Sequence, residues 1–392
     1  MNFKKNLFLL FFFLLNGIHL FAVDITFLNE YSLAKVNENK ANPLNILSRP
    51  SSELRNILFF DNKQDILNGN CVLTGRLRAD FSQQNNKFDN HTKYTSEYSL
   101  DINEFFYNYV TENYLVSIGR KKVKWGVAYV ASPTDLVSPP NLLNDTDDRL
   151  HSLQGSDLAQ VTVYGDNSQL DFYILPLTPH NQNFIDSPAL ALRFYHYLQP
   201  FDVSLVGRVQ ENGDTYWGGN TAITIGDGLE LHSEYVFGKV TRGLLGGQWS
   251  PNKDINLIVE YFHLSDGFSN SEWENYQSTL DQINRGLTND LTRDQARGNL
   301  YELFSTKKFP LRKDYIFSRF LNKRIYNEID FEVAALLGFN DGSFLQQSTV
   351  TVKISDSIKA YLRLVSAFGT KDTEFRQFPD KYQFLMGTVV KI

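Results

Sequence analysis

The histidines and their neighbours are the residues of this chain most capable of catalytic chemistry. A hydrolase needs a nucleophile, a base and an orienting group within hydrogen-bond reach of one another. His151 is followed directly by Ser152 and soon afterwards by Asp157, so the three residue types lie close in the sequence. Closeness in sequence is poor evidence of closeness in space, and no nucleophile motif or phosphate-binding loop accompanies them. We therefore expect no catalytic residues and no cofactor.

Two groups of ionisable residues could be considered as metal ligands. His232 lies between Glu230 and Glu234, and the alternation of a strand would place all three on one face. The second group is a run of charged residues in one loop: Asp135, Asp145, Asp147, Asp148 and Arg149. Neither group has the spacing of a known ligand loop. We interpret the first as part of a hydrated polar wall and the second as a charged loop, and we expect no metal site.

The first residues indicate export from the cytoplasm. Lys4 and Lys5 precede an apolar run of Leu and Phe over residues 7–15, and Ala22 offers a small residue for cleavage. This layout predicts a cleaved signal peptide over residues 1–22. The apolar run is shorter than the roughly 20 residues that span a bilayer, which argues against a retained anchor helix. Loss of the two lysines takes the net charge from −6 to −8, which argues against nucleic acid as a partner.

The composition of the remaining chain favours a barrel in a membrane. Cys71 is the only cysteine, so no internal disulfide can form, and it lies far from any lipoprotein cleavage position. The 31 Phe and 20 Tyr residues suit the aromatic girdles of a membrane barrel. A soluble enzyme of this length has less need of so many aromatic residues.

Period-two alternation dominates the sequence from about residue 70. Near residue 360, for example, Ile358, Leu362 and Leu364 share one face of a predicted strand, whereas Lys359 and Arg363 share the other. A soluble β-sandwich also alternates in this way, so the lengths of the connections must decide between the two folds.

Short and long connections follow one another along the chain. We predict strands near 70–82, 94–111, 113–123, 157–166, 168–176, 188–199, 202–211, 214–226, 229–239, 243–251, 255–264, 313–323, 327–338, 343–355, 357–368 and 381–392. Every second connection is very short, whereas several of the others are long: 82–93, 124–156, 177–187, 265–312 and 369–380. Outer-membrane barrels show this asymmetry between periplasm and exterior. The sequence therefore predicts an all-β, transmembrane, antiparallel up-and-down barrel of about 16 strands (14–18) over residues 69–392.

The two ends of the predicted barrel carry further information. Gly387, Val390 and Ile392 fit the C-terminal strand pattern that the barrel-insertion machinery reads, although Phe is usual at the last position. Residues 23–68 precede the first predicted strand and alternate poorly. We expect this segment to be an N-terminal periplasmic extension or an inward plug, and the sequence does not choose between them.

The 265–312 loop is predicted to contain two short helices. Ser271 and Glu274 can form a capping box, after which Tyr276, Leu280 and Ile283 recur at helical spacing. A second helix is predicted to start near Thr292, with one apolar face: Ala296, Leu300, Leu303 and Phe304. Such a loop could act as a lid or constriction, or it could pack on the rim, and both alternatives stay open.

One stretch resembles a known group of barrels. Gly119-Arg120, then Trp125-Gly126, then Pro133 and Asp135 form a pattern similar to that of porin-like barrels of the alginate-export and related outer-membrane groups. The resemblance covers about residues 115–175, with Lys121 and Ala128 departing from it. It implies passage or export of a solute through the outer membrane. From the residues themselves we expect Trp125 at the membrane interface and Gly126 in a sharp turn.

The charged residues of the alternating strands predict the lining of a pore. A charge that faces lipid near the midplane costs about 2–4 kcal/mol for Arg or Lys, so charged residues should point inward. The predicted pore-lining residues are Arg76, Arg78, Asp101, Arg193, Arg208, Glu230, Glu234, Glu260, Glu328, Asp330, Glu332, Lys353 and Arg363. Because the acids concentrate between residues 228 and 335, we expect a basic wall facing an acidic one.

These observations lead to one functional hypothesis and one alternative. The favoured hypothesis is an outer-membrane channel, not an enzyme, that passes or exports small polar solutes and has outer-membrane lipid and the barrel-insertion machinery as partners. The alternative is an outer-membrane barrel enzyme of the lipase or protease type. Such enzymes are commonly narrower, at ten or twelve strands, so the strand count discriminates between the two.

Overall fold

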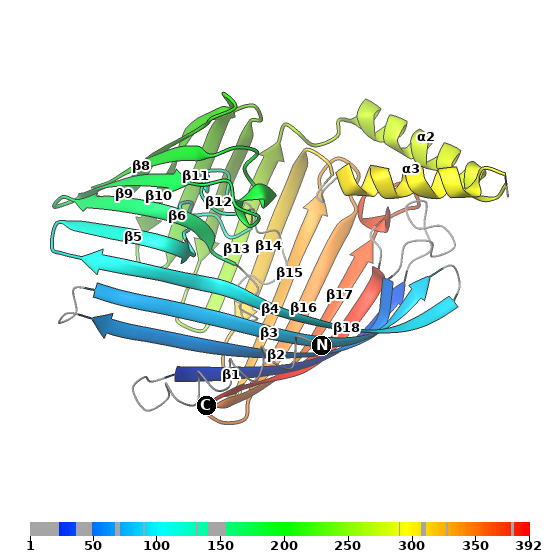
Figure 1. Cartoon of the computed structure of the whole chain (residues 1–392), viewed down its shortest axis with the longest axis horizontal. Helices are drawn as coiled ribbons and strands as arrows, with labels where there is room; N and C mark the ends of the chain where they lie inside the picture. Colours follow the sequence, from blue (N-terminus) through cyan, green and yellow to red (C-terminus); the bar gives the residue numbers. More distant parts are fainter. Residues whose placement is uncertain are drawn as a thin grey trace.

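A computed structural model describes residues 23–36, 49–66, 71–88, 91–130, 132–139, 154–289, 291–306, 311–326, 328–377 and 380–392. Within these residues the chain forms one antiparallel sheet (Figure 1). Its strands are β1 (Val23–Val36), β2 (Arg49–Ile66), β3 (Cys71–Phe88), β4 (His91–Val110), β5 (Tyr114–Lys121), β6 (Ser156–Tyr164), β7 (Ser168–Leu175), β8 (Ala189–Leu198), β9 (Phe201–Gln210), β10 (Thr215–Ile225), β11 (Leu229–Gly238), β12 (Arg242–Trp249), β13 (Ile255–Leu264), β14 (Asp314–Asn322), β15 (Ile329–Gly338), β16 (Phe344–Lys353), β17 (Ile358–Phe368) and β18 (Asp380–Lys391).

The sheet closes on itself. Each strand pairs with the strand that follows it in the sequence, and β1 pairs with β18 to complete the ring. At the junction, the Ile25 amide donates to the Ile392 carbonyl at 3.1 Å, and the Ile392 amide donates to the Ile25 carbonyl at 2.9 Å. A closed ring leaves no strand edge with unpaired backbone groups, which is the condition for a sheet to cross lipid.

The alternation of side chains sorts the wall into an apolar outside and a mixed inside. On β17, Leu362 and Leu364 face outward and are 49% and 45% exposed, whereas the inward Tyr361 and Arg363 are 8% and 5% exposed. The same pattern holds on β7 and β8, where Phe172 and Leu190 face outward. The predicted antiparallel barrel is thus confirmed, with apolar side chains where lipid would lie.

The barrel has 18 strands in its described residues, at the upper end of the predicted range rather than at about 16. The two additional strands, β1 and β2, lie within residues 23–68, which therefore contribute wall strands and not the expected extension or plug. Leu28, Ile57 and Phe59 explain the error, because these apolar side chains lie on the inner face and are fully buried there. Alternation read from the sequence alone fails where the inner face is apolar.

The connections at the two ends of the barrel differ in length. Short turns join β4 to β5 and β8 to β9 at the end where the described chain starts and finishes, and long connections follow β5 and β13 at the opposite end. We call these the short-turn end and the long-loop end. The expected long loop over 82–93 is wrong, because β3 runs to Phe88 and β4 starts at His91. β4 therefore extends well beyond β5, whereas β2 pairs with β3 along nearly its whole length.

Two helices form a hairpin at the long-loop end (Figure 1). They are α2 (Asn270–Leu287) and α3 (Arg293–Thr306), which pack on each other through the buried side chains Trp273, Tyr276, Leu280, Ile283, Leu287, Ala296 and Leu300. The capping box of α2 uses Ser269 and Glu272 instead of the predicted Ser271 and Glu274. The sequence offers both frames, and the earlier one starts the helix. Among the described residues, neither helix is long and apolar enough to cross a membrane.

Two expectations fall partly outside the described residues. The predicted signal peptide over residues 1–22 lies outside them entirely and stays a prediction. The charged run from Asp145 to Arg149 and the neighbouring His151-Ser152 pair also lie outside them.

Closure of the ring predicts a simple property of the refolded protein. Unboiled protein should migrate differently from boiled protein on a denaturing gel, because a closed sheet resists detergent until heat opens its hydrogen bonds. Identical mobility of unboiled and boiled samples, refolded in the same detergent, would contradict closure through β1 and β18.

Candidate functional site

Part of the connection between β5 and β6 lies inside the barrel against the wall. Its described residues, 122–130 and 132–139, are here called the inner segment. Trp125, Leu136 and Val137 pack on inward-facing apolar residues of one part of the wall: Leu158, Tyr173, Leu175, Ala189, Ala191, Val206 and Val236. Ala128 and Val130 pack on a second set: Leu244, Ile258, Phe262, Tyr315, Phe317, Ala334 and Leu336. The inner segment thus narrows the lumen while it lies on apolar side chains of the wall.

Glu234 on β11 holds the inner segment to the wall. One carboxylate oxygen accepts hydrogen bonds from the amides of Val127 at 2.6 Å and Ala128 at 2.7 Å. The other oxygen accepts from the Ser132 hydroxyl at 2.7 Å and from the amide and hydroxyl of Thr134 at 3.0 and 2.7 Å. The side chain is 2% exposed. A buried carboxylate is tolerated when donors satisfy its oxygens, and these bonds are stronger than those between neutral groups.

Glu260 on β13 provides a second attachment. It accepts hydrogen bonds from the amides of Tyr129 at 2.8 Å and Val130 at 3.3 Å. Nε2 of His232 lies 3.0 Å from the same carboxylate, and Nδ1 of His232 lies 3.4 Å from Glu230. His232 therefore connects the two acids on the inner face of the wall. Among the described residues, no cluster of His, Cys, Asp or Glu could hold a metal ion.

The residues of the motif lie in or beside the inner segment, although not as the sequence suggested. Trp125 is buried inside the barrel, edge-on to Tyr173 at 5.2 Å, and the expected place at the membrane interface is wrong. Gly126 is required by close packing, because a Cβ there would lie 1.5 Å from the Ser132 hydroxyl oxygen and 2.5 Å from a Glu234 oxygen. Pro133 is buried in the turn in which the Asp135 amide donates to the Ser132 carbonyl.

The first part of the motif has a structural role in the wall. Gly119 has a φ of +126°, and a Cβ there would lie 2.3 Å from the Phe105 carbonyl oxygen. Arg120 pairs with Asp157 at 2.7 Å, in register with the outward-facing Phe105. It therefore faces the outside of the barrel near the long-loop end, while Lys121 faces inward and donates to Gln160 at 3.0 Å.

Most of the predicted pore-lining residues face the interior, where many have partners of opposite charge. Arg76 bonds Asp61 and lies 3.1 Å from Glu104, and Arg78 lies 2.8 Å from Asp80. The other inward residues and their partners are Asp101 with Ser99, Arg193 with Asp171 at 3.9 Å, Glu332 with Arg319 at 3.0 Å, Arg363 with Thr349, and Arg208 with the Leu136 carbonyl. The basic residues of β3 therefore do not form a wall of a single charge, because Arg76 lies beside Glu104 of β4 and Arg78 lies beside Asp80 of β3 itself.

Three of the predicted residues lie at the short-turn end. Glu328 is exposed just before β15, Asp330 accepts the Arg324 amide of the preceding turn, and Lys353 pairs with Asp356 in the next turn. These side chains can line only the mouth of the barrel, because their strands start or stop there.

Several interior charges escaped the sequence analysis. Arg55 and Asp61 were missed because β2 was not predicted. Asp80 has the same parity as Arg76 and Arg78 on β3, so the alternation of that strand would have identified it. Arg319 was missed because its inward neighbours on β14, Phe317 and Leu321, are apolar.

Within the part of the chain that the structure describes, Arg208 and Arg363 have no carboxylate partner. Arg208 donates to the Leu136 carbonyl at 2.9 Å and lies over the Tyr216 ring at 4.7 Å. Arg363 lies over the Tyr361 ring at 5.8 Å. Both carry a positive charge on the inner face of the wall, although the two residues are only 7% and 5% exposed.

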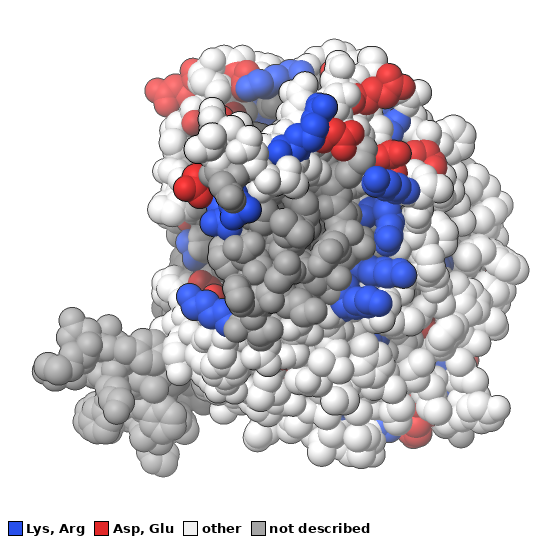
Figure 2. Space-filling model, turned by 90° about the vertical axis from the view of Figure 1, so that its right-hand side faces the viewer, with Lys and Arg blue, Asp and Glu red and all other residues white. Residues whose placement is uncertain are grey.

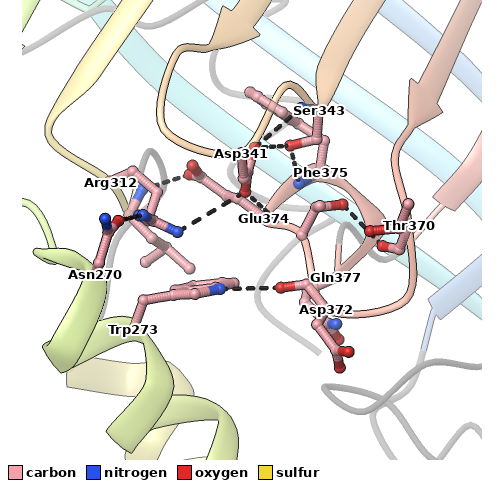
Figure 3. A network of polar contacts seen from close by, with 12 residues as sticks. Asn270, Trp273, Arg312, Asp341, Ser343, Thr370, Asp372, Glu374, Phe375 and Gln377 are labelled. Carbon is pink, nitrogen blue, oxygen red and sulfur yellow. Dashed lines mark hydrogen bonds and ion pairs between the residues drawn. The ribbon is translucent and has the colours of Figure 1, made fainter.

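A buried polar cluster fixes the base of the helical hairpin to the rim (Figure 3). Glu374, in the connection from β17 to β18, accepts hydrogen bonds from the Leu311 amide at 2.6 Å and the Tyr315 hydroxyl at 2.7 Å. Asp341 accepts the Glu374 amide at 2.8 Å and lies 3.9 Å from Arg312. The hairpin thus joins two other connections of the long-loop end.

The hairpin itself contributes an aromatic anchor to this cluster. The Trp273 indole donates to the Asp372 carbonyl at 2.9 Å, and the Arg312 guanidinium lies over its ring at 5.3 Å. Figure 1 shows the two helices extending away from the barrel end. These contacts favour packing on the rim over the alternative of a lid or constriction.

Comparison with known proteins identifies the fold. No family model matches the chain, and no curated protein matches it in sequence. The solved structure of Pseudomonas aeruginosa OccK5 (OpdH) is similar, with a TM-score of 0.55 at 9% identity over 94% of this chain and 97% of that chain. Pseudomonas aeruginosa OccK11 (OpdR) gives 0.56 at 8% identity over 94% and 95%. Acinetobacter baumannii OccAB1 gives 0.56 at 7% identity over 94% and 96%.

This chain therefore has a porin-like barrel fold, and the similarity at these identities concerns the fold alone. The resemblance of its motif to the alginate-export group finds no counterpart in these comparisons and stays a prediction.

The attachment of the inner segment can be tested at Glu234. In Glu234→Gln the side chain loses its charge and presents an NH₂ group to backbone donors, which should weaken the attachment by about 3 kcal/mol. Amide hydrogen exchange across residues 125–137 should then accelerate about a hundredfold, since each 1.4 kcal/mol is about tenfold. Glu328→Gln, at an exposed position, is the matched control and should leave the exchange unchanged. Equal protection in Glu234→Gln and the wild type would show that Glu234 does not hold the segment.

The rim cluster should respond to pH through Glu374. Burial raises the pKa of this carboxyl from its usual 4.5 to about 7. Because the folded state disfavours the ionised form, the stability that Glu374 contributes is complete below about pH 4.5 and is lost as the pH rises to about 7. Hydrogen exchange of α2, corrected for intrinsic rates, should become faster over this range in the wild type. Glu374→Gln cannot ionise and should remove the change, so the same pH dependence in this variant would contradict the assignment.

Proposed function

We propose that this chain forms an outer-membrane channel for the passive passage or export of small polar solutes. The observation that carries the proposal is a closed barrel whose outside is mainly apolar. Inside it, the inner segment is attached to the wall by hydrogen bonds to Glu234 and Glu260 and narrows the interior. Attachment to carboxylates on β11 and β13 holds the inner segment in one position, so the passage beside it has a defined size. Outer-membrane lipid, a small polar solute and the barrel-insertion machinery are the partners that follow from it.

The shared fold supports this function and this location. The similar solved structures belong to the Occ and Opd group of outer-membrane porins. We propose the same membrane for this chain, with residues 1–22 as its cleaved signal peptide. We also propose that the motif from Gly119 to Asp135 marks the entry and the turn of an inner segment, which would explain its recurrence in barrels of the alginate-export and related groups.

The charges of the interior support a polar solute and weak ion selectivity. Most of the described interior arginines lie within 4 Å of a carboxylate on the same or a neighbouring strand, so the two signs largely offset each other. The face shown in Figure 2 carries both signs as well, with Lys and Arg on both sides of its middle and most Asp and Glu in its upper part. Arg208 and Arg363 remain as a modest positive bias inside.

The alternative of a barrel enzyme receives less support. Enzymatic barrels of the lipase and protease type are commonly narrower than the 18 strands found here. The acids closest to the inner segment, Glu234 and Glu260, are both occupied by backbone donors, which leaves neither available as a general base.

Electrical recording in planar bilayers tests the proposed function. Refolded protein should produce discrete conductance steps, because each inserted barrel adds one passage of fixed size. The reversal potential in a salt gradient should lie near zero with a slight anion preference, which Arg208→Gln together with Arg363→Gln should abolish. Absence of steps from protein that shows heat-modifiable migration would overturn the channel function. Strong selectivity that survives the double substitution would instead refute the assignment of these two arginines.

A further inference from the structure

The outer wall formed by β16, β17, β18, β1 and β2 carries polar side chains where lipid-facing residues are expected to be apolar. In Figure 1 this is the part of the barrel where the last strands, in orange and red, meet the first, in blue. We call it the seam wall. Asn29 lies on the outer face of β1 between Phe27 and Tyr31, near the middle of the strand. Its register partner on β2 is Asn56, between Leu54 and the outward-facing Leu58.

Further polar residues continue this pattern on the neighbouring strands. Thr388 of β18 is in register with Asn29 and lies on the same outer face as Met386. On β16, Gln346 and Ser348 face outward, in register with the outer residues of β17. One of these β17 residues is Ser366, which lies between the outward-facing Leu364 and Phe368. The polar groups thus extend across all five strands of the seam wall.

The rest of the outer face is different. On β7, β8 and β9, the outward positions hold large apolar residues such as Phe172, Leu190 and Leu205, which are 48%, 62% and 60% exposed. Along the fully described strands β5 to β13, no outward position holds Asn or Gln. Amide side chains on the outside are therefore a property of the seam wall when compared with these strands.

Lipid cannot satisfy these amides. The Asn29 amide donates to the Asn56 side-chain oxygen at 2.7 Å, and the Gln346 amide donates to the Ser348 hydroxyl at 3.1 Å. Each amide offers two donors and an oxygen with two acceptor positions, so a single bond leaves several groups without a partner. An amide that is not hydrogen-bonded in an apolar medium costs several kcal/mol. The polar headgroups of lipid lie at the membrane surfaces, away from the middle of β1.

We propose that the seam wall is the surface through which copies of this chain associate within the membrane. Amides both donate and accept, so the same patch on a second copy is complementary to it, as a two-fold contact requires. Hydrogen bonds between polar side chains, together with small residues that allow close approach, drive association where lipid removes the hydrophobic effect. Ala360, in register with Thr388, provides such a small neighbour.

Cross-linking tests which wall faces the second copy. In a Cys71→Ser background, Thr388→Cys places a thiol in the seam wall, and Phe172→Cys places one on the outward face of β7 as the matched control. Mild oxidation of protein in lipid bilayers should give disulfide-linked pairs with Thr388→Cys and none with Phe172→Cys. Pairs formed equally at both positions, or only at the control position, would overturn the proposal.

The amides themselves are tested by the double variant Asn29→Leu with Asn56→Leu. The lipid-corrected mass of the wild type should correspond to more than one chain, and the double variant should shift towards the mass of one chain. The double variant is expected to fold, because the change replaces polar groups by apolar ones on a lipid-facing surface. Heat-modifiable migration of the variant on a denaturing gel verifies that it has folded. Thr221→Val with Ser233→Ala, which removes outward hydroxyls from β10 and β11, should leave the mass unchanged. A wild type with the mass of one chain, or a double variant that stays associated, would refute the proposal.

Discussion

The need to pair every backbone polar group inside lipid is the constraint on which this structure depends. A sheet meets it only by closing, and here the closing contact is between β1 and β18. Closure fixes the register of every strand, and register decides which side chains face inward. Most of the outside is then apolar, while the inside carries charges, the inner segment and the apolar side chains on which that segment packs.

The inner segment follows from the same rule applied to the lumen. A loop folded into the barrel carries amides that water no longer satisfies, so the wall must provide acceptors for them. Glu234 and Glu260 provide these acceptors, and each uses both carboxylate oxygens to accept from neighbouring donors, whereas a Gln side chain has one acceptor oxygen. Gly126 leaves the space in which the Glu234 carboxylate reaches the backbone. The two buried acids thus give the inner segment a definite position, and that position depends on both of them.

Much of the fold could be predicted from the sequence, because a strand with an apolar outside and a charged inside alternates between apolar and charged residues. β11 and β17 are examples, with apolar residues outside and charged residues inside. The first two escaped for a physical reason: Leu28 and Phe59 are apolar inside, and Asn29 and Asn56 are polar outside, so both faces break the rule. The candidate site was harder. Glu234 and Glu260 were correctly expected to point inward, but their partners lie about a hundred residues away in a loop whose path no local pattern specifies. The predicted position of Trp125 was wrong for the same reason, since an aromatic residue suits a buried apolar cluster as well as a membrane interface.

The central claim is that the inner segment, held by Glu234 and Glu260, sets the size of the passage. Its most direct test is single-channel conductance in the presence of neutral polymers of graded size, which report the radius of the narrowest part by their exclusion. The wild type should exclude polymers that enter the double variant Glu234→Gln with Glu260→Gln, and the open conductance of that variant should be higher. An unchanged exclusion limit in a variant whose inner segment exchanges its amides freely would contradict the account and would place the constriction elsewhere in the barrel.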